Sequence, residues 1–138
     1  MAAMSQLERF GVSMERDLLE QFDAHIAQRG YQTRSEALRD LVRRELVNHL
    51  WEHPDAQVMG TVTILYDHHA RGLADALAEL QHSHHQLVIC TSHVHVDAHN
   101  CLEVIIVRGA SGRVRKVADQ LLAIKGVKHG QLVCSALQ

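Results

Sequence analysis

The sequence predicts an α+β protein of two domains, on three observations. A short alternating segment and two helical segments occupy residues 1–50. Six further segments follow in the order strand, helix, strand, strand, helix, strand, which is the ferredoxin-like βαββαβ arrangement. The only proline and the only tryptophan lie between the two sets, where the helical period breaks. We therefore expect a first domain over residues 1–50, a linker over 51–58 and a second domain over 59–138.

The first domain is predicted to be a strand followed by two helices. Apolar residues alternate with small or charged ones over residues 8–14, as in a strand with one buried face. Apolar residues then recur every three to four positions over 15–29, and Gly30 ends this helix. Residues 33–36, TRSE, form a capping box that begins a second helix reaching Leu50. A lone strand has both edges unpaired, so we expect two copies to pair antiparallel in a dimer.

The second domain is predicted from alternation and helical spacing. Its segments are strand 61–66, helix 69–82, strand 87–96, strand 102–107, helix 111–124 and strand 131–135. One face of strand 87–96, expected to pack under the helices, carries Val88, Cys90, Val94 and Val96. The other face carries Leu87, Ile89, Thr91, His93 and His95. If helices cover only one side of the sheet, the apolar residues of this second face would be exposed to solvent. We therefore expect the second face to contact another subunit, with the histidines at the interface.

Composition narrows the class of protein. The net charge is −2 and the pI is near 6.6, so the chain as a whole has no excess of positive charge that would attract DNA. A prediction of DNA binding must therefore rest on a specific sequence motif. The first residues have no apolar secretory core, and no apolar run approaches the roughly 18 residues of a membrane span. With an odd number of cysteines as well, we expect a cytoplasmic protein with reduced thiols and no membrane partner.

The segment from residue 82 to residue 101 holds six of the chain's twelve histidines and predicts a metal site. His93 and His95 share one face of a strand, roughly 7 Å apart, which is close enough to bind one ion. If residues 96–100 make the connection to the next strand, Cys101 lies opposite His95 on the same face.

A further histidine from residues 82–85 completes a His₃Cys set. Nitrogen and sulfur ligands suit Ni²⁺, Cu²⁺ or Zn²⁺, and the residues alone leave this choice open. Glu103 is a candidate to accept a hydrogen bond from a ligand histidine. Other histidines are expected to be surface, capping or bystander residues: His25, His49, His53, His68, His69, His99 and His129.

The first domain resembles the ribbon-helix-helix DNA-binding domain. The resemblance is carried by the strand and the following MERDLLEQFDAHIAQRGYQTRSEALRDLVRREL, most specifically by RSEALRD. It implies that paired strands enter the major groove of double-stranded DNA. It also implies base contacts by Arg9, Gly11 and Ser13, and a phosphate at the N-terminus of the second helix. The residues at that N-terminus are Thr33, Arg34 and Ser35.

Nearly the whole chain resembles the NikR family of nickel-responsive regulators, because such a domain precedes a βαββαβ domain with the pattern H-x₁₀-H-x-H-x₅-C. The resemblance implies an ACT-type second domain, a homotetramer built as a dimer of dimers, and a square-planar Ni²⁺ shared between subunits. The implied ligands are His93, His95 and Cys101 of one chain and His82 from the neighbouring subunit. A second cation is implied between the two domains, held by Glu36 and Asp40.

The predicted function is a nickel-responsive transcriptional repressor and not an enzyme. It would bind a palindromic operator when Ni²⁺ occupies the intersubunit site, and so control nickel uptake genes. A metal-dependent hydrolase is the first alternative, but it needs an open coordination position, which four protein ligands do not leave. A nickel storage or delivery protein is the second alternative, and it would not bind DNA sequence-specifically.

Overall fold

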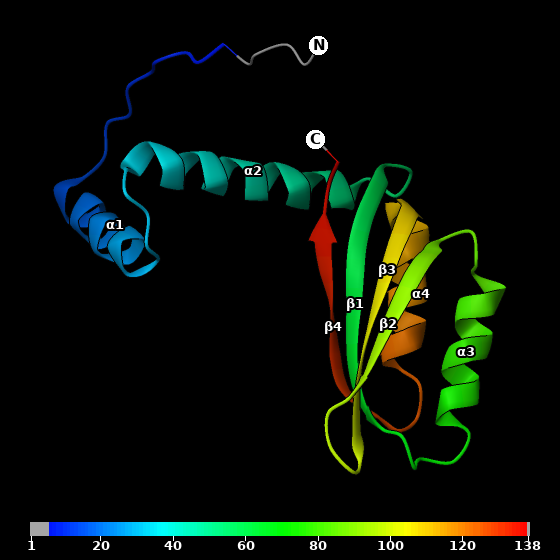
Figure 1. Cartoon of the computed structure of the whole chain (residues 1–138). Coiled ribbons are helices and arrows are strands. Elements are labelled where there is room, and N and C mark those ends of the chain that lie inside the picture. The colour runs from blue at the N-terminus through cyan, green and yellow to red at the C-terminus, as the bar shows by residue number, and fades with distance from the viewer. Residues whose placement is uncertain (1–5, 138) are drawn as a thin grey trace. The chain divides into compact units, whose positions relative to one another are not determined.

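The computed structural model of the chain describes residues 6–137. Two compact units are present, Met1–Val42 and Arg43–Gln138, and helix α2 (Arg34–Glu52) runs from the first into the second (Figure 1). Of the predicted linker over residues 51–58, only residues 53–56 lie outside helix and strand. Trp51 is buried in the last turn of α2, and its Nε1–H donates to the carbonyl of Ser135 over 3.0 Å. Within the described residues no helix is long and apolar enough to cross a membrane.

The first unit contains both predicted helices, α1 (Arg16–Gln28) and the start of α2. Gly30 follows α1 with a φ of 84°, and the Tyr31 N–H donates to the Ile26 carbonyl over 3.1 Å, which is a left-handed helix end that favours glycine. One half of the capping box at α2 is confirmed, because the Glu36 N–H donates to Thr33 Oγ1 over 3.2 Å. The Glu36 side chain accepts from the N–H of Gln32, one residue before the predicted cap residue Thr33.

The strand predicted over residues 8–14 is not formed in the single chain. Residues 6–15 have no regular secondary structure, and Phe10 is 79% exposed and Val12 59% exposed. A β-strand needs a partner for its backbone N–H and C=O groups. The prediction paired this strand with a second copy, and one chain does not provide that partner.

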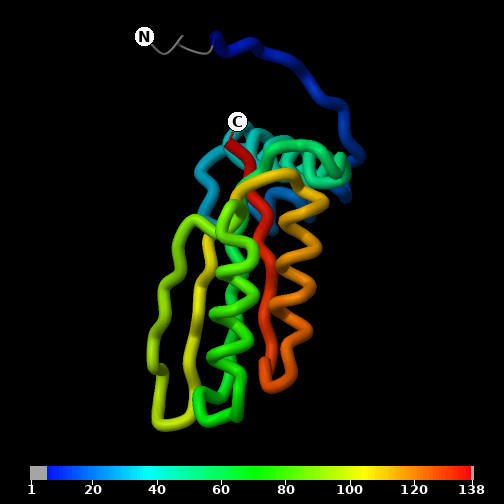
Figure 2. The backbone as a smooth tube through the Cα atoms, turned by 90° about the vertical axis from the view of Figure 1, so that its right-hand side faces the viewer, coloured from blue at the N-terminus to red at the C-terminus, as the bar shows by residue number. Residues whose placement is uncertain are grey.

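The second unit has the predicted βαββαβ order. Its elements are β1 (Gln57–Asp67), α3 (Leu73–Ser83), β2 (Val88–His95), β3 (Asn100–Ala110), α4 (Ser111–Leu122) and β4 (Val127–Ser135). The strands form one antiparallel sheet in the order β2-β3-β1-β4. Both helices cover the same face of this sheet, and the other face is open (Figure 2). The core between the layers includes Val62, Ile64, Leu77, Ile105 and Leu121, all buried.

Helix α3 begins four residues later than the predicted start at residue 69. A turn precedes it, in which Asp67 Oδ1 accepts a hydrogen bond from the His69 N–H over 2.9 Å. Gly72 then takes a φ of 75°, and the helix follows directly. The turn matters because it places His68 beside the end of β1.

The histidines of β2 point toward the helices, contrary to the prediction. His93 lies opposite Glu103 of β3, and His95 lies opposite Cys101. Directly opposed residues share a face of the sheet, and Glu103 and Cys101 are both buried on the face that the helices cover. Val94, predicted to pack under the helices, is 53% exposed on the open face.

A β-bulge at the start of β2 explains the difference. The register shifts between Val88 and Cys90, so that one extra residue on β2 moves the following side chains to the opposite face. Val88 therefore faces the helices as predicted, whereas Cys90 does not. Val96 lies just past the strand and is 56% exposed, and Leu87, predicted on the open face, is only 3% exposed.

Candidate metal centre

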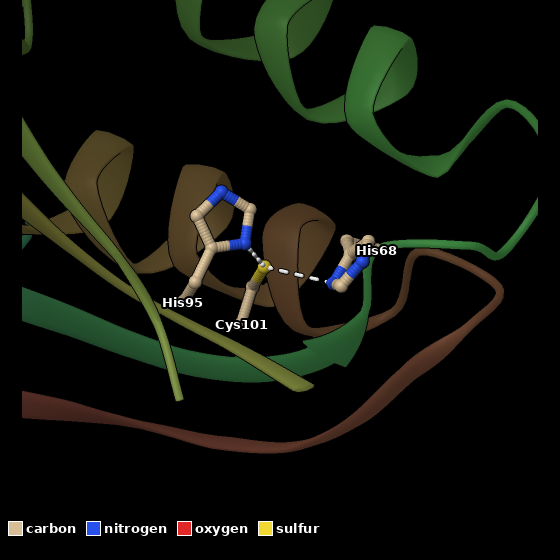
Figure 3. Close-up of side chains that lie close together, drawn as sticks. All are labelled: His68, His95 and Cys101. Carbon is tan, nitrogen blue, oxygen red and sulfur yellow. Dashed lines mark hydrogen bonds between the residues drawn. The ribbon is translucent and has the colours of Figure 1, made fainter. Parts of the chain in front are cut away.

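Three side chains that can bind a metal ion meet at one end of the sheet. Cys101 Sγ lies 3.4 Å from His68 Nδ1 and 3.3 Å from His95 Nδ1 (Figure 3). The candidate ligand atoms of these three residues all lie within 4.8 Å of one another. Two imidazole nitrogens and one thiolate suit a late first-row divalent ion. The donor set therefore fits Ni²⁺.

Strand pairing brings these residues together. β1 ends at Asp67, which pairs with Asn100 at the start of β3, and the next N–H, of His68, donates to the His99 carbonyl over 3.0 Å. β2 and β3 are joined by a tight turn in which His95 lies opposite Cys101, as the five-residue connection predicted.

Asp97 holds this turn. Its carboxylate accepts hydrogen bonds of 2.8 Å from the backbone N–H groups of His99 and Asn100 and from the Asn100 side chain. These hydrogen bonds, led by that of the Asn100 side chain, lower the pKa of Asp97 to about 2. The connection between His95 and Cys101 is thus fixed by an ionised carboxylate.

Two of the four predicted nickel ligands, His95 and Cys101, belong to this group. His93 is next to it, with its ring centroid 5.0 Å from that of His95, but its Nε2 lies 3.4 Å from the hydroxyl of Tyr66. His82 lies in the last turn of α3 and lines one hollow together with His93. The third member of the group is His68, which was predicted to be a surface or capping residue.

The signal that could have found His68 is topological. In a βαββαβ fold the first and third strands are antiparallel neighbours. The residues just after the first strand therefore lie beside those just before the third, where Cys101 is.

The protonation states of the group follow from burial. Burial raises the pKa of the Cys101 thiol, and the nearby carboxylates of Glu103, Asp67 and Asp97 raise it further. Burial lowers the pKa of His68, as do the neighbouring histidines His69 and His95. At neutral pH the imidazole of His68 is therefore neutral, with a lone pair to donate, while the thiol must lose a proton before it binds an ion.

A hydrogen-bonded chain connects α3 to the strands beside the ligands. Thr91 Oγ1 donates to Gln81 Oε1 over 2.7 Å, and Gln81 Nε2 donates to Glu103 Oε1 over 3.0 Å. Glu103 is only 6% exposed. Burial, followed by the charges of Glu103 and Cys101, raises the pKa of Tyr66 to about 12, so its hydroxyl stays protonated near His93. Gln81 and Tyr66 were not singled out from the sequence.

The residues predicted to contact DNA lie in the first unit. Arg9, Gly11 and Ser13 are in the segment without secondary structure, and all three are exposed. Thr33 precedes α2, and Arg34 and Ser35 begin it. The guanidinium of Arg34 makes two hydrogen bonds of 2.8 Å with the carboxylate of Asp23.

The two residues predicted to hold a second cation, Glu36 and Asp40, have protein partners in the single chain. Glu36 Oε2 accepts from the Gln32 N–H over 3.2 Å, and Asp40 Oδ2 accepts from the Tyr31 hydroxyl over 2.9 Å. Their carboxylates lie one turn apart on α2.

Fold and site together define a two-domain metal-binding protein, with a helical first unit before a ferredoxin-like domain that carries histidine and cysteine ligands. The family model "NikR C terminal nickel binding domain" matches residues 59–135, and "Ribbon-helix-helix protein, copG family" matches residues 8–48. The chain belongs to the NikR family of nickel-responsive regulators, so it is a DNA-binding transcription regulator that uses Ni²⁺, and not an enzyme. The hydrolase alternative is thereby set aside.

Curated relatives agree along almost the entire length. The chain is 56% identical over 130 residues to a putative nickel-responsive regulator of Geobacter sulfurreducens, covering 94% of each chain. It is 57% identical over 129 residues to one of Solibacter usitatus, covering 94% of this chain and 93% of that one. A solved structure of an uncharacterized protein, TM1266 of Thermotoga maritima, aligns with 56% of this chain and 96% of its own, at a TM-score of 0.51 and 14% identity. That likeness shows the fold alone.

Proposed function

We propose that the protein is a repressor that binds a palindromic operator when Ni²⁺ occupies a site shared between subunits, and so controls nickel uptake genes. The observation that carries the proposal is the convergence of His95, on the edge strand β2, with Cys101 on the neighbouring strand β3, whose Nδ1 and Sγ atoms lie 3.3 Å apart. Edge strands present unpaired backbone groups to a second copy of the chain. A metal site at such an edge depends on how subunits are placed.

The proposed ligands are His93, His95 and Cys101 of one chain and His82 of the partner subunit. His93 supports this set because it lies on the same side of the sheet as His95, one pleat away. Nickel bound by ligands of two chains would supply a cross-link between them. The three ligands from one strand hairpin hold their positions through the turn at Asp97 and the pairing of β2 with β3.

Glu103 is proposed as a positioning residue. Its buried carboxylate lies opposite His93 and is itself fixed by Gln81 of α3. A carboxylate that accepts a hydrogen bond from a ligand imidazole orients the ring and makes it a better donor. The chain from Thr91 through Gln81 to Glu103 would also tie the position of α3, which carries His82, to the ligand strand.

DNA recognition is assigned to the first domain. In a dimer, residues 8–14 of two chains would pair as a ribbon in the major groove, with Arg9, Gly11 and Ser13 toward the bases. The N-terminus of α2 at Thr33 and Ser35 would seat a phosphate. Arg34 contributes less directly, because its guanidinium is held by Asp23.

Glu36 and Asp40 are proposed to hold a cation. To do so they would have to give up or share the hydrogen bonds from Gln32 and Tyr31. Carboxylate oxygens are the donors that hard cations such as Mg²⁺, Ca²⁺ or Mn²⁺ prefer.

Regulation would be a population shift in a homotetramer built as a dimer of dimers. Cross-linking by ligands of two chains favours one placement of the subunits, and the DNA-binding dimers then fit both half-sites of a palindrome. Nickel binding and operator binding would both favour the same placement of the subunits. Operator DNA should therefore in turn raise the affinity of the protein for Ni²⁺. As a regulator that binds operator DNA, the protein would act in the cytoplasm.

Operator binding with and without Ni²⁺ tests the proposal. Footprinting on the DNA upstream of the protein's own gene identifies the operator, and a gel-shift titration then compares affinities. We expect Ni²⁺ to raise operator affinity by about tenfold or more, which is the usual size of an allosteric coupling. Equal affinities would exclude a nickel-dependent repressor, and failure to find any sequence-specific site would favour the storage or delivery protein.

A further inference from the structure

A second cluster of histidines lies at the C-terminal end of α2, apart from the centre described above. His49 is in the last turn of the helix, and His53 is the first residue after it. Their rings meet edge to face with centroids 4.8 Å apart, and the two Nε2 atoms are 3.3 Å apart. Both side chains are exposed. None of these residues belongs to the group of His68, His95 and Cys101.

The separation of the two nitrogens matches a chelate. Two imidazole nitrogens bound to one ion at about 2.0–2.1 Å, at the tetrahedral angle, lie roughly 3.3–3.4 Å apart, whereas a right angle would bring them to about 2.9 Å. The observed 3.3 Å between the Nε2 atoms corresponds to the tetrahedral case. Four residues also separate the paired histidines of helical zinc sites, and here the second histidine directly follows the helix.

Glu52 lies where a supporting carboxylate is needed. Its Oε2 is 3.4 Å from Nδ1 of His49, whereas His53 approaches the other ring nitrogen, Nε2. A carboxylate there favours the tautomer with the proton on Nδ1, which leaves the lone pair of Nε2 free for an ion. The sequence His49-Leu50-Trp51-Glu52-His53 thus supplies two donors and the group that orients one of them.

The backbone of this turn is held in place. The His53 carbonyl accepts a hydrogen bond from Ser111 Oγ over 2.5 Å, and the His53 N–H donates to the Leu50 carbonyl over 3.2 Å. Between the two histidines, Trp51 is buried in the core of the second unit. The backbone that carries both donors is therefore fixed, and the exposed rings leave the remaining positions of an ion open to water.

We propose that His49 and His53 bind a divalent transition-metal ion with tetrahedral preference, Zn²⁺ foremost, at a site separate from the nickel centre. The two Nε2 atoms are the protein ligands, and Glu52 is a positioning residue for His49. Both histidines lie in the second unit, at the C-terminal end of α2.

Zn²⁺ binding to the full chain tests this site once the nickel centre has been removed. In a His95→Ala/Cys101→Ala background, equilibrium dialysis against Zn²⁺ should give one bound ion per chain more than in the same background with His49→Ala/His53→Ala. The matched control is His25→Ala/His129→Ala, which removes two histidines that lie outside any histidine cluster of the described residues and should leave the count unchanged. Far-UV circular dichroism verifies that α2 is intact in each variant.

A second readout separates chelation from a simple hydrogen bond between the rings. Long-range ¹H–¹⁵N spectra should show Zn²⁺-dependent shifts of the Nε2 signals of both His49 and His53, and Glu52→Gln should weaken binding by roughly tenfold. Equal Zn²⁺ counts with and without the two histidines would overturn the proposal, as would unshifted Nε2 signals at saturating Zn²⁺. Neither outcome bears on nickel-dependent operator binding, which is measured separately.

Discussion

Replacing Glu103 by Gln should weaken nickel binding while leaving the fold intact. The side chain is 6% exposed, lies opposite His93, and accepts a hydrogen bond from Gln81 over 3.0 Å. Gln has the same shape and can still accept that hydrogen bond, so the free energy of unfolding should change by less than about 1 kcal/mol. Losing a carboxylate that supports a ligand histidine typically costs about 10–100-fold in metal affinity, which is roughly 1.4–2.7 kcal/mol.

An opposing effect has to be weighed. Glu103 also raises the pKa of Cys101, so its removal makes the thiolate easier to form. The carboxylate repels one negative charge on sulfur but attracts two positive charges on the ion at similar range, so the attraction is the larger of the two effects. The net result of Glu103→Gln is therefore weaker binding.

The assay for Glu103→Gln is Ni²⁺ titration against a competing chelator, with urea unfolding of the same samples. Glu79→Gln on α3 is the matched control, because Glu79 is exposed and lines a different hollow. Unchanged nickel affinity in Glu103→Gln, with unchanged stability, would refute the role given to this residue.

Three further predictions concern the same domain. If the four-ligand set is correct, His82→Ala removes a ligand and should lower nickel affinity by about 100-fold or more, whereas His68→Ala should lower it by less than about tenfold. Both affinities are measured by titration against a chelator. The reverse order would make His68 the fourth ligand. Because the pKa of Cys101 is raised, the thiol is protonated at neutral pH and nickel binding must release its proton. Apparent affinity should then rise with pH throughout the range below that pKa, by up to about tenfold per unit, and Cys101→Ser should flatten the profile measured from pH 6.5 to 8.5. Gly130→Ala should lower the free energy of unfolding in urea by about 1–3 kcal/mol, because an added Cβ would lie 2.5 Å from the carbonyl oxygen of Thr63. An unchanged urea midpoint of unfolding would show that β4 shifts to accommodate the methyl group without loss of stability.

Periodicity was sufficient for the helices and for the order of strands, because both depend on local spacing of apolar residues. The pairing of His95 with Cys101 was also predictable, since the length of a hairpin connection fixes which residues oppose each other. The face of β2 was predicted wrongly. Apolar residues were assigned to the inner side, but a bulge shifts the register, and the inner side of this edge strand carries the polar site instead.

Other features depend on contacts that a local pattern does not contain. His68 joins the group because β1 and β3 are neighbours in the sheet, although 33 positions separate it from Cys101. The strand over residues 8–14 needs a second chain to supply its hydrogen bonds, so its formation is a property of the dimer. Assignment of His82 to the partner subunit likewise concerns an assembly of chains.

Subunit mixing tests the shared site most directly. His82→Ala and Cys101→Ala variants should each fail to bind Ni²⁺ in the high-affinity range when measured alone. The two variants are mixed in equal amounts and refolded together. In a mixed dimer, the His82→Ala chain supplies His93, His95 and Cys101 to one site, and the Cys101→Ala chain supplies its His82. About half of the dimers are mixed and each has one intact site of two, so random pairing restores about a quarter of the wild-type sites. Recovery near that level in equilibrium dialysis is the result we expect. No recovery in the mixture would contradict a site divided between two chains.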